Sequence, residues 1–309
     1  MATNSTSAPA AKGVADTERR RPRLSPDTVS GYGFLAPFLI VYLVFLVYPL
    51  FRGFYLSLHQ WDLLAGPLGW TGLQNYQDLL TDPTFWTALG NTFYFVVLTV
   101  PLTTVLALVL ALALSKPTRT NAVFRAIFFS SSIVSVTVVT LIWQMVLSPS
   151  RGILAQALGT VGIPPLDWLN DQHLAMLALV IATVWWSLGL PLMLFSAGLQ
   201  QIPGDIYEAA RLDNASGWRT FRYITWPALH RTTVLVVLIE IILHFQVFGQ
   251  PFLMTKGGPA GSTRSLVQYI YEGGFRDWHL GYASTGAMVL FVVMLIASLA
   301  QLHFSRKED

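Results

Sequence analysis

Long apolar segments separated by short polar ones run through most of the chain. Six of them stand out, at about 34–56, within 85–114, at about 126–147, within 174–200, at about 232–255 and at about 280–304. Each is longer than the roughly 20 residues that an α-helix needs to cross a bilayer. The pattern therefore predicts an all-α, polytopic membrane protein whose six transmembrane helices occupy residues 31–305.

The composition agrees with a membrane protein. Hydrophobic residues make up 53% of the 309 residues and charged residues only 11%, and the mean hydropathy is +0.54. Cysteine is absent, which excludes a disulfide framework and thiol chemistry. Residues 1–30 are rich in Ala, Ser, Thr and Pro and contain a cluster of Arg, so we expect them to form a disordered tail.

The basic residues predict how the chain is oriented. Of the 19 Lys and Arg residues, 14 lie in the N-terminal tail, the connection between the second and third spans, the polar segment 203–229 with Arg231 just after it, and the C-terminus, and five lie on the other side. Positively charged connections are enriched in the cytoplasm. We therefore expect both termini, including residues 306–309, and the segment 203–229 to be cytoplasmic.

The segment 203–229 is polar and lies between two apolar spans. Pro203 and Gly204 end any preceding helix, after which Asp205 can cap a new helix and Glu208 can complete a capping box. Asp213 and its neighbours are turn residues, and we expect Gly217 to relieve the backbone at the bend. A second short helix over 218–224 would end before Pro227.

This spacing resembles the cytoplasmic loop of permease subunits of binding-protein-dependent type I ABC importers. The chain differs from the usual pattern at Asn214, where Gly is common, and at Trp226, where Leu is common. In that family the loop inserts into a cleft of the ATPase subunit and transmits its motion. The resemblance implies that the ATPase-coupling residues are Glu208, Ala209, Ala210, Asp213, Gly217, Ile224 and Pro227.

A second stretch is similar to the carbohydrate and glycerol-phosphate branch of the same family. The similarity includes residues 245–248, 254–259 and 269–272, with Gly249 in place of a common Asp. The family implies an ATP-driven importer, not an enzyme, in the cytoplasmic (inner) membrane of a bacterium or archaeon. Its solute would be a sugar, a glycerol phosphate or a glycerophosphodiester.

The resemblance also implies the partners. They are a second permease, a dimeric cytoplasmic ATPase that binds ATP and Mg²⁺, and an extracytoplasmic solute-binding protein; this chain itself would bind no cofactor, and no nucleic acid is expected. A self-contained ATPase is excluded by the absence of a G-x-x-x-x-G-K-[ST] motif, and no H-E-x-x-H zinc motif occurs.

The fourth span offers one candidate contact with the solute. Gly189 and Pro191 weaken the helix in mid-membrane, and broken helices are tolerated where they line a cavity. The indole rings of Trp185 and Trp186, next to Ser187, could stack on a sugar ring. A packing kink with lipid-facing indoles is an equally open interpretation.

The fifth span offers the other candidate. Ionisable groups within a membrane usually face the bundle interior or a wet cavity, and here Glu240 and His244 share one helix face. Gln246 and Gln250 lie about 200° away on an ideal helix, so either the helix unwinds near Gly249 or only one pair meets the solute. We favour unwinding, with His244 and Gln246 on the solute and Glu240 set back among the helices. The candidate solute-binding residues of this span are Glu240, His244, Phe245, Gln246 and Gln250.

Two alternatives use the same pair. Glu240 and His244 could serve as base and acid of a membrane-embedded enzyme, or Glu240 could carry protons in a secondary transporter. Glu240 could also only tie helices together. Neither alternative function accounts for the segment 203–229.

Overall fold

A computed structural model of the protein describes residues 26–305. Contacts divide the chain into two compact units, with the division between Phe51 and Arg52. Helix α1 (Pro26–Tyr42) begins inside the segment 1–30 that the sequence assigns to a disordered tail, so residues 26–30 correct that prediction. Residues 1–25 and the predicted C-terminal tail 306–309 lie outside the described part of the chain.

The described residues of the first unit form a long apolar helix. Helix α1 is followed by a π-helical turn (Leu43–Val47) and by α2 (Tyr48–Ser57), which continues into the second unit. Residues Phe34–Ser57 have a mean hydropathy of 2.4 and suffice to cross a membrane by length.

The second unit begins with a small polar substructure. Strands β1 (His59–Asp62) and β2 (Gly66–Trp70) form an antiparallel hairpin with an irregularity between Gln60 and Trp61, and α3 (Gln74–Thr81) follows. Helix α4 (Pro83–Ala113) is capped by Asp82, whose side chain accepts a hydrogen bond from the backbone N–H of Thr84.

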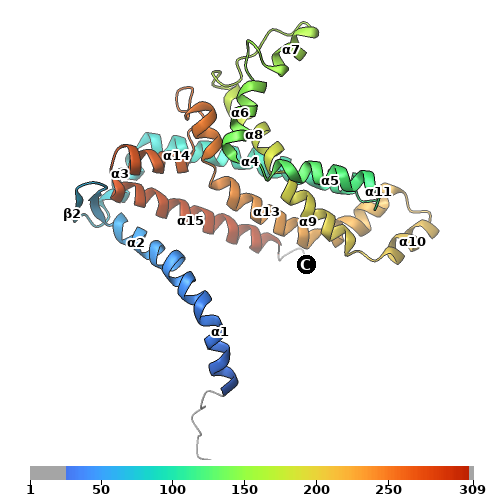
Figure 1. The fold of residues 1–309 in the computed structure, drawn as a ribbon, viewed down its shortest axis with the longest axis horizontal. Coiled ribbons are helices and arrows are strands. Elements are labelled where there is room, and N and C mark those ends of the chain that lie inside the picture. Colours follow the sequence, from blue (N-terminus) through green and yellow to red (C-terminus); the bar gives the residue numbers. More distant parts are fainter. Residues whose placement is uncertain (1–25, 306–309) are drawn as a thin grey trace, which may run out of the picture. The chain divides into compact units, whose positions relative to one another are not determined.

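Helix α4 is the central helix of this unit. It packs against α8, α9, α13 and α14, and it contributes residues to all three buried apolar clusters, for example Phe95, Ala107 and Phe85. The side chains of α4 are apolar on every side, as expected of a membrane span: half of its apolar window is buried against other helices, and side chains such as Val97 and Val105 are exposed. Figure 1 shows α13 and α15 on the same side of the second unit, where they also pack together.

The third predicted span is not one helix, which corrects the prediction for 126–147. Helices α5 (Arg119–Ser131) and α6 (Val136–Val146) meet at 98°. The side chain of Ser135 accepts a hydrogen bond from the N–H of Val138 and thereby caps α6. Helix α7 (Ile153–Thr160) follows.

Two further spans are bent. Helices α8 (Leu174–Ser187) and α9 (Gly189–Gln200) meet at 47°, where Gly189 and Pro191 predicted a weak point.

The polar loop then forms α10 (Gly204–Leu212), α11 (Gly217–Thr220), a π-helical turn (Phe221–Thr225) and α12 (Trp226–Ala228). After this loop the chain turns by 65° into α13 (His230–Phe245). After a π-helical turn (Pro251–Thr255) come α14 (Leu266–Tyr271), another π-helical turn (Glu272–Arg276) and α15 (Leu280–Ser305).

Three helices of the described chain are therefore long and apolar enough to cross a membrane, or up to six if each bent pair counts as one span. This agrees with the six apolar segments of the sequence.

A cluster of hydroxyl groups joins the start of α4 to α14 and α15. The Tyr269 hydroxyl donates to Asp82 Oδ2 at 2.5 Å and lies 2.7 Å from the Tyr282 hydroxyl. Burial acts to raise the pKa of Asp82, but hydrogen bonds from Tyr269 and from the Thr84 N–H outweigh it, so its pKa lies below the ordinary value. Burial, together with the Asp82 carboxylate, raises the pKa of Tyr269.

Candidate functional site

Helix breaks from two spans interlock near the middle of the second unit. Ser132 donates a hydrogen bond to the carbonyl of Trp186 at 2.9 Å, and its hydroxyl accepts one from the N–H of Gly189 at 3.2 Å. In return, the indole N–H of Trp186 donates to the carbonyl of Val134 at 2.9 Å. Side chains of each break thus satisfy the backbone groups that the other break frees.

The third break lies in the fifth span, as the sequence predicts. Helix α13 ends at Phe245, and helical structure resumes only after residues 246–248. A Cβ atom on Gly249 would lie 2.5 Å from Val136 Cγ2 at the start of α6. The absence of a side chain at Gly249 therefore lets this break pack closely against the first one.

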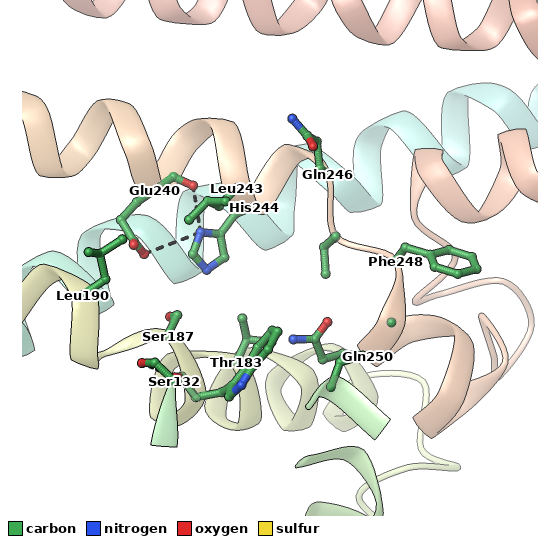
Figure 2. Close-up of a pocket in the computed structure, with 14 residues that line it drawn as sticks. Ser132, Thr183, Ser187, Leu190, Glu240, Leu243, His244, Gln246, Phe248 and Gln250 are labelled. Atoms are coloured by element: carbon green, nitrogen blue, oxygen red, sulfur yellow. Dashed lines mark hydrogen bonds and ion pairs between the residues drawn. The ribbon is translucent and has the colours of Figure 1, made fainter. Parts of the chain in front are cut away.

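These breaks surround a cavity of about 500 Å³ (Figure 2). Its wall includes Glu240, His244, Gln246 and Gln250, but the amide of Gln246 points away from the other three side chains, toward Met294 on α15 (Figure 2). The unwinding therefore brings Gln250, and not the side chain of Gln246, to the cavity that Glu240 and His244 line. Trp186 and Ser187 line the cavity as well, together with Ser132 and Thr183. Among the described residues, no Lys or Arg lines it.

Four oxygen atoms of the wall have no hydrogen-bond partner within the described chain. They are Thr183 Oγ1, Ser187 Oγ and both carboxyl oxygens of Glu240. Thr183 and Glu240 are almost completely buried, with exposed fractions of 3% and 1%. Buried polar atoms are normally hydrogen-bonded, so these four atoms are candidates for partners that the described chain does not supply.

His244 is held by the turn of helix that precedes it. Its Nδ1 lies 2.7 Å from the backbone carbonyl of Glu240 and 3.5 Å from Glu240 Oε2 (Figure 2). A carbonyl oxygen only accepts, so Nδ1 carries a proton, and Nε2 is an acceptor in the neutral ring.

Two predicted contact residues are not part of the cavity wall. The ring of Trp185 packs edge-on against Trp143 at 6.0 Å, and Phe245 packs edge-on against Phe93 at 5.1 Å. Conversely, no sequence pattern singles out Ser132 or Thr183, because small hydroxyl residues are common in apolar helices.

The loop 203–229 has the predicted pair of short helical segments, but three local predictions are wrong. Helical structure that begins at Gly217 continues through Pro227 to Ala228, so Pro227 does not end it. The N-cap of α10 is Pro203, which has no capping side chain, so Asp205 and Glu208 form no capping box. The left-handed residue of the bend is Asn214, with φ of 52°, and not Gly217, which is the first residue of α11. Asn is one of the residues that tolerates this conformation.

The predicted coupling residues divide by exposure. Glu208, Ala209, Asp213, Gly217 and Pro227 are exposed, whereas Ala210 is buried and Ile224 is half-buried. Large apolar side chains that the sequence analysis did not single out are also exposed on this loop: Leu212 (84%), Trp218 (69%) and Tyr223 (74%). Such side chains are typical of an interaction surface.

The loop and the cavity both lie in the part of the chain that matches a known family. Residues 103–309 match the profile described as "Binding-protein-dependent transport system inner membrane component". The chain belongs to this family. It is thus a multi-pass inner-membrane permease subunit of an ABC transporter and not an enzyme, which removes the two alternatives built on Glu240 and His244.

Curated relatives of this permease cover nearly its whole length. The "Probable ABC transporter permease protein YurN" of Bacillus subtilis (strain 168) is 34% identical over 91% of this chain and 97% of its own. The "Arabinooligosaccharides transport system permease protein AraP" of the same organism is 33% identical, over 89% and 88%. The "sn-glycerol-3-phosphate transport system permease protein UgpA" of Agrobacterium fabrum (strain C58 / ATCC 33970) is 31% identical, over 91% and 96%.

The permease also shares its fold with a solved structure. A chain of a bacterial ABC transporter "involved in the import of the acidic polysaccharide alginate" aligns with a TM-score of 0.78, covering 91% of this permease and 96% of that chain, at 22% identity.

Proposed function

We propose that this permease takes part in the import of an uncharged, hydroxyl-rich solute of the carbohydrate class, and that the solute contacts the cavity at the helix breaks. The proposal rests chiefly on the four unpartnered oxygen atoms of a wall that contains no Lys or Arg among the described residues. Sugar hydroxyls can both donate to and accept from such groups, together with Gln250 and His244.

An uncharged sugar fits this wall better than a glycerol phosphate. A phosphate is normally held by Arg, Lys or backbone N–H groups, whereas the ionisable side chains of this wall are Glu240 and His244. The ring of Trp186 adds an apolar face suited to stacking on a pyranose ring. Relatives named for arabinooligosaccharides and for lactose support the sugar interpretation, while those named for glycerol 3-phosphate represent the other branch.

We further propose that the loop 203–229 docks on a cytoplasmic ATPase. Its exposed face combines the predicted residues Glu208, Ala209, Asp213, Gly217 and Pro227 with the apolar side chains of Leu212, Trp218 and Tyr223. Gly217 leaves open space on this face, since no atom lies within 4 Å of a Cβ built there. This open space would let the surface of the partner approach the backbone of the loop closely.

The remaining partners follow from the family. In this proposal a second permease completes the pathway, a dimeric ATPase binds ATP and Mg²⁺, and an extracytoplasmic binding protein delivers the solute. ATP-driven closure of the ATPase dimer moves the loop and shifts the pathway between inward- and outward-facing states. Both termini and the loop lie in the cytoplasm.

The test is solute-stimulated ATP hydrolysis by the reconstituted complex. A panel would contain neutral mono-, di- and oligosaccharides, glycerol 3-phosphate and a glycerophosphodiester, each with the cognate binding protein. We expect a neutral sugar to stimulate hydrolysis and the phosphates to have no effect. Stimulation by a phosphate alone would refute the proposed solute class, and failure of the complex to hydrolyse ATP would refute the proposed coupling.

A further inference from the structure

A second polar cavity lies away from the solute site, between the polar loop and the ends of two long helices. Its volume is about 500 Å³. It is bounded by Leu112 at the end of α4, by Leu199 at the end of α9, and by the face of α10 that carries Tyr207 and Glu208. Because apolar spans end here, the cavity lies at the depth of lipid headgroups.

Basic side chains dominate the charge of this wall. Lys116, Arg125 and Arg211 line the cavity, against the single carboxylate of Glu208. Arg125 is held in place because it donates a hydrogen bond to the carbonyl of Leu114 at 2.7 Å. Within the described chain, no ion pair joins Glu208 to any of these three cations.

A buried hydroxyl on the wall lacks a partner. Ser196, on α9, lines the cavity with an exposed fraction of 7%, and its Oγ has no hydrogen-bond partner in the part of the chain that the structure describes. Burying such a group without a partner is unfavourable, so the site favours a ligand with acceptor oxygens.

The start of α10 adds backbone donors to the same wall. Gly204, the first residue of this nine-residue helix, lines the cavity, and no side chain caps the helix. Anions bind at helix N-termini because the backbone N–H groups and the helix dipole favour negative charge there.

We propose that this cavity binds a phosphate ester, with Lys116 and Arg125 neutralising its charge and Ser196 donating to a phosphate oxygen. Phosphate offers several strong acceptor oxygens to a set of donors of this kind. Basic pockets between transmembrane helices on the cytoplasmic side suit anionic lipid headgroups. A soluble phosphate ester presents the same chemistry.

The site is separate from the docking face proposed above. The exposed apolar residues Leu212, Trp218 and Tyr223 do not line it, and neither does Gly217. Glu208 is shared, so it and Arg211 on the same helix are unsuitable for a test. Lys116 and Ser196 lie on other elements and report on the cavity alone.

The test uses the full chain co-purified with its partner subunits in a maltoside detergent that contains no phosphate. One arm measures retention of phosphatidylglycerol by native mass spectrometry, and the other measures the thermal shift caused by inorganic phosphate. We expect Lys116→Gln and Ser196→Ala to weaken binding about tenfold, as the loss of one charge-assisted hydrogen bond predicts. Lys116→Arg should retain binding.

Arg119→Gln is the matched control, because Arg119 is an exposed cation near Lys116 that does not line the cavity. Binding in the lipid arm alone identifies a headgroup site, and binding in the phosphate arm alone identifies a soluble ligand. The proposal is overturned if the wild type binds neither probe, or if Arg119→Gln weakens binding as much as Lys116→Gln. Ser196→Ala leaves the charge unchanged and so separates a specific site from general attraction.

Discussion

Single residues of this permease often differ in role from what their type suggests. Trp186 lines the cavity, but its indole N–H is used to hold the backbone of the neighbouring break at Val134. Thr183 shows the opposite case, because it also lines the cavity but its hydroxyl has no hydrogen-bond partner in the described chain.

Thr183→Val therefore tests the solute site with little effect on the fold. The substitution replaces a buried, unpartnered hydroxyl by a methyl group of similar size, so we expect thermal stability to stay within about 0.5 kcal/mol. The apparent affinity for the solute should fall about fivefold, the value of one hydrogen bond. Solute titration of ATP hydrolysis measures this.

Thr99→Val provides the control for that experiment. Thr99 on α4 is also buried with an unpartnered hydroxyl, but it does not line the cavity. Equal losses of affinity in both variants would show that Thr183 acts through packing and not through the solute.

Gly217 gives a test of the docking face. As the first residue of α11, it accepts Pro without loss of an internal hydrogen bond, and Ser216 before it (φ −64°, ψ 157°) already has the conformation that precedes a Pro. We therefore expect Gly217→Pro to leave the fold of the loop intact. Gly217→Leu should reduce uptake about tenfold by placing bulk on the proposed contact.

Gly159→Leu is the counterpart on α7, where an added Cβ also meets open space. It should transport normally at equal membrane abundance. Normal uptake by Gly217→Leu would mean that this part of the loop does not face the ATPase.

At the scale of elements, the sequence predicts the positions of the spans better than their breaks. The weak point at Gly189 and the unwinding near Gly249 follow from residues with known backbone effects. The 98° bend between α5 and α6 does not, because residues 131–135 contain neither Gly nor Pro. That bend depends on hydrogen bonds between Ser131, Ser132 and the carbonyls of another span, which no local pattern reveals.

The sequence likewise predicts part of the cavity wall but not all of it. Glu240, His244 and the two Gln residues stand out because polar groups are rare in a span. Thr183 and Ser132 reach the cavity only through the packing of other spans against α13. Trp185 and Trp186 are adjacent and chemically alike, so the sequence could not tell which one faces the cavity.

The hydroxyl cluster at the start of α4 should make stability depend on Tyr269. Tyr269→Phe removes the hydrogen bond to Asp82, so we expect a loss of about 1–2 kcal/mol at neutral pH. The pKa of Asp82 is lowered in the folded state, so its contribution is complete above the unfolded pKa near 3.9 and disappears as the pH falls through the lower, folded pKa. The wild type should therefore lose more stability on acidification than Tyr269→Phe.

Thermal unfolding at pH 7 and near pH 3 measures both effects. Tyr271→Phe is the control on the same helix, because the contacts of Tyr271 are ring contacts with Phe248, Phe252 and Phe275. If the two variants behave alike, the hydroxyl cluster contributes nothing specific.

At the scale of the whole second unit, contacts group the connecting segments into two ends. Residues 112–125 share a cavity with the loop 203–225. At the other end, the backbones of Asp62 and His279 form an isolated antiparallel β-bridge, and the side chain of Asn91 donates to the carbonyls of Gly261 and Arg264. The charge distribution of the sequence assigns the first group to the cytoplasm.

Accessibility tags check this orientation. Tags at positions 118 and 215 should be labelled only from the cytoplasm, and tags at 66 and 261 only from outside. The tagged variants must retain uptake for the result to count. Labelling of position 215 from outside in intact cells would invert the assignment and remove the proposed ATPase contact.

The meeting of the helix breaks at the cavity has a consequence for how such permeases diverge. Ser132, Trp186 and Gly249 keep the breaks together, so few substitutions are open to them. Three other residues line the same cavity from within regular helices: Thr183, Leu190 and Leu243. Their side chains are not among those described above that hydrogen-bond to the backbone of a break. We therefore expect homologues that transport other solutes to vary at Thr183, Leu190 and Leu243. The three residues that hold the breaks together should be kept, so the solute could change without a change in the arrangement of the helices.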